Sequence, residues 1–268
     1  MFNIISIASG YDGGMKMTGN TILITGGGSG IGRSLAEEFH KLGNQVIVAG
    51  RRRDALDSVT AAHPGMTSAV VDLADAASIQ SFAARIAAEY PALNVLINNA
   101  GIMKPEKLQE SPANLADAEM IVATNLLAPI RLTAAFLPLF QKQDHATIMM
   151  VSSGLAFVPL TMTPTYCATK AAIHSYAQSL RRQLKDTKVE VLELVPPYVA
   201  TELMGSHQAN DPRAMPLGEF IAEVMQILAT RPEATEILVK RVVPLRFAEE
   251  KGPAAYQQMF DGLNRTAF

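Results

Sequence analysis

The stretch from Thr21 to Gly32 constrains the fold of this chain more than any other part of the sequence. A β-branched apolar run, Thr21 to Thr25, ends in glycines, and a helix-like pattern begins at Arg33. Glycines at such a junction allow positive φ angles and the close approach of a phosphate, while the helix N-terminus offers free N–H groups. The sequence therefore predicts a strand, turn and helix that bind a pyrophosphate. A glycine-rich turn without a ligand is the alternative.

Strand-like and helix-like segments alternate along the rest of the chain. The strand-like segments lie near residues 21–25, 45–50, 67–71, 93–98, 146–151, 188–195 and 236–240. This alternation predicts an α/β fold, a doubly wound parallel sheet of about seven strands with helices on both faces. Ligands of such sheets bind beyond the carboxyl ends of the strands. After Pro216 we expect a helix at 220–229, a strand at 237–240 and an irregular end.

Composition narrows the classes of function. The formal net charge of −2 gives no electrostatic case for a nucleic acid or an anionic membrane surface. We find no apolar run of the ~18 residues that a membrane span needs. The single cysteine, Cys167, excludes an intrachain disulfide and makes a cytoplasmic location the expectation. The histidines show no metal-ligand spacing, so no metal is expected. An apolar start without a basic residue before Lys16 argues against a secretory signal.

The spacing of the motifs points to a known family. The pattern Thr-Gly-x-x-x-Gly-x-Gly on Thr25, Gly26, Gly30 and Gly32 resembles the single-domain branch of the short-chain dehydrogenase/reductase (SDR) family. Its other motifs follow in the family's order, with Asn98-Asn99-Ala100-Gly101, then Asn125, Ser153 and Tyr166-x-x-x-Lys170. The resemblance covers roughly residues 20–205 and implies a Rossmann fold. We expect a flexible extension at 1–18 and one Rossmann-fold domain at 19–268, with a substrate loop at about 196–216 and assembly into a homo-oligomer, a dimer or tetramer.

Four residues are candidates for catalysis. The resemblance implies that Tyr166 is the general acid/base, that Ser153 polarises the substrate oxygen and that Lys170 and Asn125 support them. The family places its serine thirteen residues before the tyrosine, which selects Ser153 over Ser152. A free tyrosine has a pKa of about 10, and an ammonium such as that of Lys170 favours the phenolate. A surface tyrosine beside a solvated lysine is the alternative.

A proline supports the interpretation of Asn125. Pro129 has no N–H, so within a continuous helix the carbonyl of Asn125 loses its partner. In the family, an asparagine at the matching position lies in such a distortion and holds a water linked to the catalytic lysine. A plain kink that serves packing is the alternative.

The end of the second strand predicts the choice of cofactor. Gly50 stands where an NAD-dependent enzyme usually has an acidic residue, and Arg51 and Arg52 follow it with planar donors suited to a phosphate. We therefore expect NADP (NADPH) in preference to NAD; solvated arginines on a surface turn are the alternative. Asp72 either contacts the adenine, as in the family, or caps a helix with Asp75. The cofactor-binding residues that we expect are Gly26, Ser29, Gly30, Ile31, Gly32, Arg51, Arg52, Asp72, Leu73, Asn98, Ala100, Gly101, Tyr166, Lys170, Val199 and Thr201.

These residues together predict an NADP(H)-dependent oxidoreductase that interconverts an alcohol and a carbonyl by hydride transfer. A catalytically idle dinucleotide-binding sensor of the same fold is the alternative. The apolar segment from Leu155 to Met162, with Tyr198, Leu203 and Met204, predicts a pocket for a small, fairly apolar carbonyl or alcohol; core or subunit packing is the other interpretation. Pro197 stands where the family usually has glycine, which predicts a stiffer loop.

Overall fold

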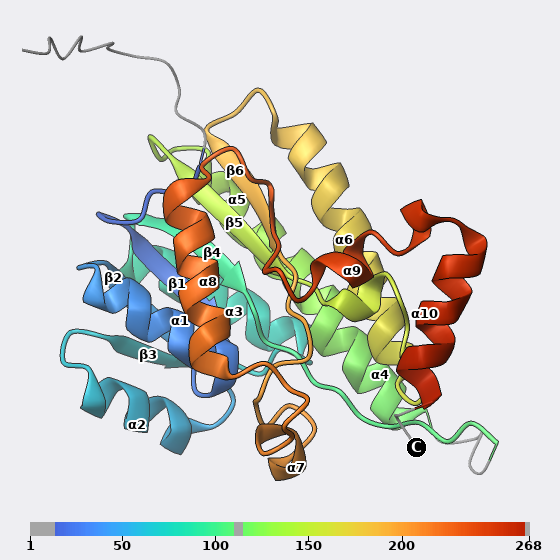
Figure 1. The fold of residues 1–268 in the computed structure, drawn as a ribbon. Coiled ribbons are helices and arrows are strands. Elements are labelled where there is room, and N and C mark those ends of the chain that lie inside the picture. Colours follow the sequence, from blue (N-terminus) through green and yellow to red (C-terminus); the bar gives the residue numbers. More distant parts are fainter. Residues whose placement is uncertain (1–13, 110–114, 266–268) are drawn as a thin grey trace, which may run out of the picture.

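A seven-stranded parallel sheet forms the centre of the molecule. The computed structural model describes residues 14–109 and 115–265. Within these residues the strand order is β3-β2-β1-β4-β5-β6-β7, and every pairing is parallel (Figure 1). This confirms the predicted doubly wound α/β fold. The strands are β1 (Thr21–Thr25), β2 (Gln45–Gly50), β3 (Thr67–Val70), β4 (Leu93–Asn98), β5 (Ala146–Val151), β6 (Val189–Leu194) and β7 (Glu236–Ile237).

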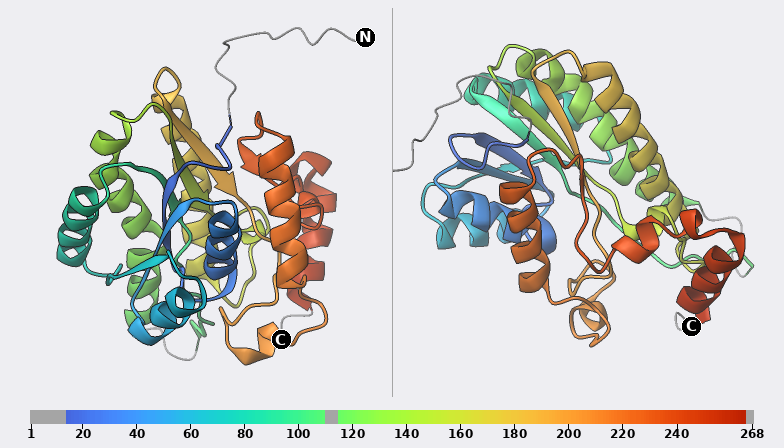
Figure 2. Two further views of the ribbon diagram at one scale, coloured as in Figure 1. Left: turned by 90° about the vertical axis from the view of Figure 1, so that its left-hand side faces the viewer. Right: turned by 45° about the horizontal axis from the view of Figure 1, so that its top comes forward.

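Helices cover both faces of the sheet (Figure 2). Ile22 and Ile24 of β1 face one core, while Leu23 between them faces the other, because successive side chains of a strand point to opposite faces. Both faces are buried, which explains why most residues of the strands are apolar. The first core is closed by α1 (Gly30–Lys41), α2 (Arg53–Ala62) and α8 (Leu217–Thr230), and the second by α3 (Ala76–Glu89), α5 (Ala128–Phe140) and α6 (Pro164–Leu184).

The helix between β4 and β5 contains the predicted distortion. α4 (Ala116–Val122) runs through a π-helical turn, Ala123–Leu127, into α5, and the Ala128 N–H donates to the carbonyl of Ala123, five residues back. Pro129 has no N–H to continue the ordinary pattern, and a single π turn is a common result. Among the described residues, Ala116–Phe140 is the one helix long and apolar enough to cross a membrane, with mean hydropathy 1.6. Core helices pass the same test, and here Phe136 and Phe140 pack on the sheet.

Two predictions about the C-terminal part were wrong. The seventh strand ends at Ile237 instead of residue 240. The N–H groups of Glu193 and Val195 donate to the carbonyls of Thr235 and Ile237, and the next residue in this alternation, Pro197, has no N–H. The end of the chain is also not irregular. It forms α9 (Val243–Arg246), a 3-10 turn (Glu249–Lys251) and α10 (Pro253–Arg265). No residue of α10 is fully buried, although Tyr256, Met259, Phe260 and Leu263 recur at helical spacing and are half-buried.

The N-terminal boundary also differs from the prediction, and residues 1–13 lie outside the described residues. Met15 is buried in the first core, and the side chains of Asn20 and Asn44 donate to the carbonyls of Lys16 and Met17 at 2.7 and 2.9 Å. The chain from Met15 onward therefore packs with the domain, and an extension that ends at residue 18 is too long.

Candidate active site and cofactor cleft

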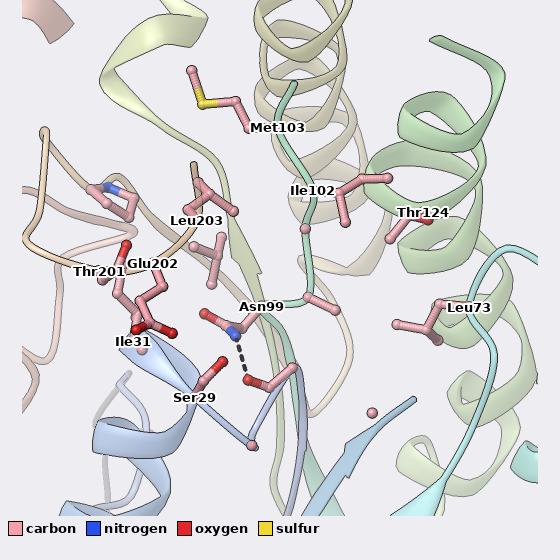
Figure 3. A pocket seen from close by; sticks show the side chains of 18 of the residues that line it. Ser29, Ile31, Leu73, Asn99, Ile102, Met103, Thr124, Thr201, Glu202 and Leu203 are labelled. Atoms are coloured by element: carbon pink, nitrogen blue, oxygen red, sulfur yellow. Dashed lines mark hydrogen bonds between the residues drawn. The ribbon is translucent and has the colours of Figure 1, made fainter. Parts of the chain in front are cut away.

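A cavity of about 480 Å³ lies beyond the carboxyl ends of β1, β2, β4 and β5 (Figure 3). This is the edge of the sheet at which ligands of doubly wound folds bind. The structure brings most of the predicted site residues to its wall: Gly26, Ser29, Gly30, Ile31, Arg51, Arg52, Leu73, Ala100, Gly101, Ser153, Tyr166, Lys170, Val199 and Thr201. Four predicted residues, Gly32, Asp72, Asn98 and Asn125, are not on the wall.

The glycine-rich turn forms a cradle that only glycine permits. Gly26 and Gly30 have φ angles of +69° and +55°. A Cβ on Gly26 would lie 2.9 Å from the Cα of Ala100, and one on Gly32 would lie 2.5 Å from the carbonyl oxygen of Gly26 and would overlap the side chain of Asn99. The N-terminus of α1 therefore opens directly into the cavity. Free N–H groups at a helix N-terminus suit a diphosphate, so this cradle fits a dinucleotide.

Two arginines stand where β2 ends. Arg51 and Arg52 are exposed and line the cavity, and Nη2 of Arg52 donates to Oγ of Ser29 at 3.2 Å. A Cβ on Gly50 would meet nothing closer than Cδ2 of Leu56 at 3.8 Å, so this position has room for a bulky neighbour. α2 begins at Arg53, which places three cationic side chains at a helix N-terminus. Such a cluster suits a phosphate bound between them.

Asp72 is used in a local turn. Its carboxylate accepts from the N–H of Ala74 at 3.0 Å, and its own N–H donates to Ser78. Asp75 caps α3 by accepting from the N–H of Ala77 at 2.9 Å. The capping alternative therefore describes this segment better than a contact with adenine, whereas Leu73 does reach the cavity.

The asparagine pair after β4 divides between core and cavity. Asn98 is buried and its Nδ2 lies 3.4 Å from Sδ of Met150, while its Oδ1 has no partner among the described residues. Asn99, which the prediction omitted, lines the cavity (Figure 3). Its Nδ2 donates to the carbonyl of Thr25 at 2.9 Å. Adjacent residues of a strand point to opposite faces. The alternation of side chains along β4 could therefore have shown that Asn98 and Asn99 point in different directions.

Tyr166 and Lys170 lie one turn apart on α6 and are both buried. Nζ of Lys170 lies 5.5 Å from the centre of the Tyr166 ring and donates to the carbonyl of Val151 at 2.8 Å. Burial raises the pKa of the Tyr166 hydroxyl well above its ordinary value, and the hydrogen-bonding side chain of Ser153 only partly opposes this. Burial also lowers the pKa of Lys170 to about 8, against the carboxylate of Glu193. Burial is the largest influence on the pKa of Tyr166, and it acts against the phenolate that the neighbouring ammonium was expected to favour.

The two serines after β5 have different partners. Oγ of Ser152 donates to Oε1 of Glu193 at 2.5 Å, so its proton is already used. Oγ of Ser153 accepts from the N–H of Leu155 at 3.1 Å, which leaves its own proton available for another acceptor. Both line the cavity, but only Ser153 combines a place beside Tyr166 with a proton to donate.

Asn125 supports the cavity wall from behind. Its side chain accepts from the N–H of Ile102 at 2.9 Å and donates to the carbonyl of the same residue at 2.8 Å. A Cβ on Gly101 would lie 3.5 Å from Oδ1 of Asn125 and 3.7 Å from Nζ of Lys170. The π turn therefore brings Asn125 next to both the loop after β4 and Lys170.

The predicted substrate wall was mostly wrong. No residue from Leu155 to Met162 lines the cavity; Val158 is fully buried, and Leu155 and Leu160 pack with Tyr166 and Cys167. Tyr198 and Met204 are also outside the wall. The apolar residues that do line this part are Ile102, Met103, Pro196, Pro197, Val199 and Leu203, with Lys104 and Glu202 among them.

A buried glutamine, which the sequence did not indicate, holds the loop over this wall. Nε2 of Gln208 in α7 (Ser206–Ala209) donates to the carbonyl of Val199 at 2.8 Å, and its Oε1 accepts from the N–H of Met204 at 3.1 Å. Val199 also pairs with Met215 in an isolated bridge. The loop after Pro197 is thus fixed at both ends.

Comparisons with known proteins agree with this geometry. A sequence model described as short chain dehydrogenase matches residues 20–212. The Bacillus subtilis protein named "Uncharacterized oxidoreductase DltE" is 40% identical over 93% of this chain and 98% of its own length. The NADP-dependent 3-hydroxy acid dehydrogenase of Schizosaccharomyces pombe is 31% identical over 85% of this chain and 94% of its own. A short-chain dehydrogenase from Sphingobium yanoikuyae in complex with NADPH superposes with a TM-score of 0.73, at 26% identity and over 91% and 92% of the two chains.

Proposed function

The chain belongs to the short-chain dehydrogenase/reductase family and is an NAD(P)-dependent oxidoreductase, and from that premise we propose that it interconverts an alcohol and a carbonyl with NADP(H). One observation carries the proposal. The cavity joins Ser153, Tyr166 and Lys170, beyond β5, to Arg51, beyond β2. Three strand spacings separate β2 from β5, which is about 14 Å, a span suited to an extended dinucleotide.

The residues at the β5 end have complementary roles in the proposed mechanism. The nicotinamide, when bound, supplies hydride to the carbonyl carbon or removes it from the alcohol. Ser153 donates a hydrogen bond to the substrate oxygen, where negative charge grows during reduction. Tyr166, whose pKa is raised by burial, stays protonated at neutral pH and gives its proton to that oxygen. Lys170, held by the carbonyl of Val151, keeps a positive charge beside the tyrosine.

The preference for NADP(H) over NAD(H) rests on Arg51 and Arg52. Both are exposed guanidinium groups on the cavity wall, and Gly50 leaves room for a ribose 2′-phosphate. The S. pombe relative is NADP-dependent and the S. yanoikuyae neighbour holds NADPH, which supports the proposal. A Burkholderia phymatum neighbour in complex with NAD, 22% identical with a TM-score of 0.75, shares the fold alone.

The substrate that fits best is a small, uncharged and fairly apolar carbonyl. Ile102, Met103 and Leu203 offer apolar contacts near the catalytic residues (Figure 3). The charge of Lys104 is paired with Asp117 at 2.5 Å, which weakens its attraction for an anionic substrate. A catalytically idle sensor of the same fold is the second candidate, and the buried, convergent Ser153, Tyr166 and Lys170 speak against it.

The test is oxidation of NADPH with a panel of ketones, aldehydes and quinones. Tyr166→Phe should lower kcat by at least about 100-fold, the usual contribution of a positioned acid. Tyr176→Phe is the matched control, since Tyr176 lies on the same helix, half-buried and away from the cavity. Equal rates for wild type and Tyr166→Phe would refute the mechanism, and inactivity of the wild type on every substrate would favour the sensor.

A further inference from the structure

A carboxylate that the catalytic motif does not include lies directly behind the active site. Glu193 is in β6, its side chain is fully buried, and it is not on the cavity wall. We propose that Glu193 is a positioning residue of the active site, which acts through Ser152 and Lys170 without touching the substrate. This inference rests on the proposed function in one respect, because it assumes that Ser152 and Lys170 support the proposed hydride-transfer reaction.

The first contact of Glu193 fixes the end of β5. Glu193 is the register partner of Met150, and the N–H of Ser152 donates to the carbonyl of Leu194 at 2.9 Å. Oε1 of Glu193 accepts the hydroxyl proton of Ser152 at 2.5 Å. Main chain and side chain of Ser152 are thus both held by β6. Ser153 follows directly, so its position depends on this anchor.

The second connection is electrostatic and reaches Lys170. Its Nζ donates to the carbonyl of Val151, and the next residue, Ser152, donates to the carboxylate of Glu193, so both charges are anchored to adjacent residues of the chain. In a buried setting their attraction favours the charged form of the lysine. Burial lowers the pKa of Lys170 to about 8, and Glu193 is the group that opposes this. Without Glu193 the lysine would lose its proton at lower pH.

Other charged groups around Glu193 come from three elements. On α6, Nδ1 of His174 lies 2.7 Å from Oε2 of Glu193, and the guanidinium of Arg181 donates to the carbonyls of Val191 and Thr235. Glu236 of β7 pairs with Arg246 of α9 at 2.6 Å. His174, Glu193 and Glu236 lie close enough together to suggest a cation site, but Arg246 already supplies the positive charge to Glu236.

A purely structural role explains the burial of Glu193 less well. An ionised carboxylate without full hydrogen bonding is costly in the interior, so each of its oxygens needs a donor. One oxygen has His174, which reaches toward the surface, but the other is paired with a serine of the cavity wall. The carboxylate therefore links the active site to the helix face behind it.

The direct test is the titration of Lys170 in the cofactor-free protein. NMR of 13C-lysine-labelled protein follows the Cε signals with pH, and the loss of one signal in Lys170→Met assigns it. Glu193→Gln should lower the pKa of Lys170 by up to about 1 pH unit, since an opposite charge is removed without a change of shape. Glu190→Gln, on the same strand, is the matched control and should leave that titration unchanged. An unchanged pKa of Lys170 in Glu193→Gln would overturn the electrostatic part.

Kinetic measurements test whether Ser152 positions Ser153, and they separate this role from the proposed function. Ser152→Ala should lower kcat on the order of tenfold through a displaced Ser153, while the KM for NADPH stays within twofold. In Glu193→Gln the alkaline limb of kcat should move to lower pH together with the lysine titration. A wild-type kcat in Ser152→Ala overturns the positioning role, even where Glu193→Gln fails to fold. Inactivity of the wild type on every carbonyl refutes the proposed function instead, and the NMR result is unaffected by it.

Discussion

Removal of the Arg51 side chain should separate the affinity for NADPH from that for NADH. Arg51 directly follows β2 and lines the cavity, whereas Arg52 is partly engaged by Ser29. One charge-assisted hydrogen bond contributes about 1.5–3 kcal/mol. Arg51 is exposed, so solvent and salt screening place its contribution at the lower end, about 1.5 kcal/mol. Arg51→Ala should therefore weaken NADPH binding about tenfold. NADH lacks the 2′-phosphate and should bind as before.

The assay is a fluorescence titration of both nucleotides at low and high ionic strength. The loss for NADPH should shrink as salt rises, because the contact is electrostatic. Arg53→Ala is the matched control, since Arg53 is exposed on the same segment but does not line the cavity. Gly50→Asp is the complementary variant, because it adds a negative charge where Arg51→Ala removes a positive one. A Cβ at this position would lie in ordinary contact with Leu56 at 3.8 Å, and the carboxylate that it carries should repel the 2′-phosphate.

Two results would refute this reasoning. An equal loss of affinity for NADPH and NADH in Arg51→Ala would show that the arginine contacts a part of the nucleotide that both share. Tighter binding of NADH than of NADPH by the wild type would overturn the preference itself.

Three further predictions concern stability. Gly32→Ala places a Cβ 2.5 Å from the Gly26 carbonyl and should cost about 1–3 kcal/mol in denaturant unfolding, whereas Gly262→Ala, with open space around it, should not destabilise the protein. Glu106 caps the first turn of α6, where it accepts from the N–H and hydroxyl of Thr165 at 2.9 and 2.7 Å. Glu106→Ala should therefore lower the free energy of unfolding by about 1 kcal/mol, and an unchanged urea midpoint would contradict this capping role. Burial raises the pKa of Glu190 from 4.5 to about 7, so the folded state binds a proton more tightly than the unfolded state and loses stability as pH rises between these values. Glu190→Gln should therefore be more stable than wild type at pH 8 and similar to it at pH 4, as unfolding at the two pH values would show.

Local patterns predicted most of the fold because both faces of the sheet are buried. Apolar runs such as Val46 to Ala49 could only be interior strands, and β1, β2, β4 and β5 lie where the alternation predicted them. The failures come where local pattern and tertiary environment diverge. Tyr256, Met259, Phe260 and Leu263 of α10 recur at helical spacing but are only half-buried, and β7 ends where Pro197 has no N–H to donate to it.

The site was predictable where one short segment supplies both the residue and its geometry. The glycine turn and the Tyr166–Lys170 pair are of this kind. Glu193 and Ser152 are not, because forty-one positions separate them and only the pairing of β5 with β6 brings them together. The apolar segment after Ser153 shows the opposite limit. The hydrophobicity of this segment is equally consistent with a pocket wall or with a core. The segment is part of the core because α6 and α9 pack over it.

The pKa of Tyr166 depends on burial, which its motif could not predict. The four-residue spacing predicts that the ammonium of Lys170 lies near the phenol, and Nζ is 5.5 Å from the ring centre. Spacing says nothing about how far both groups are removed from water. Because both are buried, desolvation disfavours the phenolate and the ammonium alike, and it raises one pKa while lowering the other. A protonated tyrosine beside a lysine that titrates near pH 8 can donate a proton to a nascent alkoxide at neutral pH. Acceptance of a proton from an alcohol requires the phenolate, the form that burial disfavours.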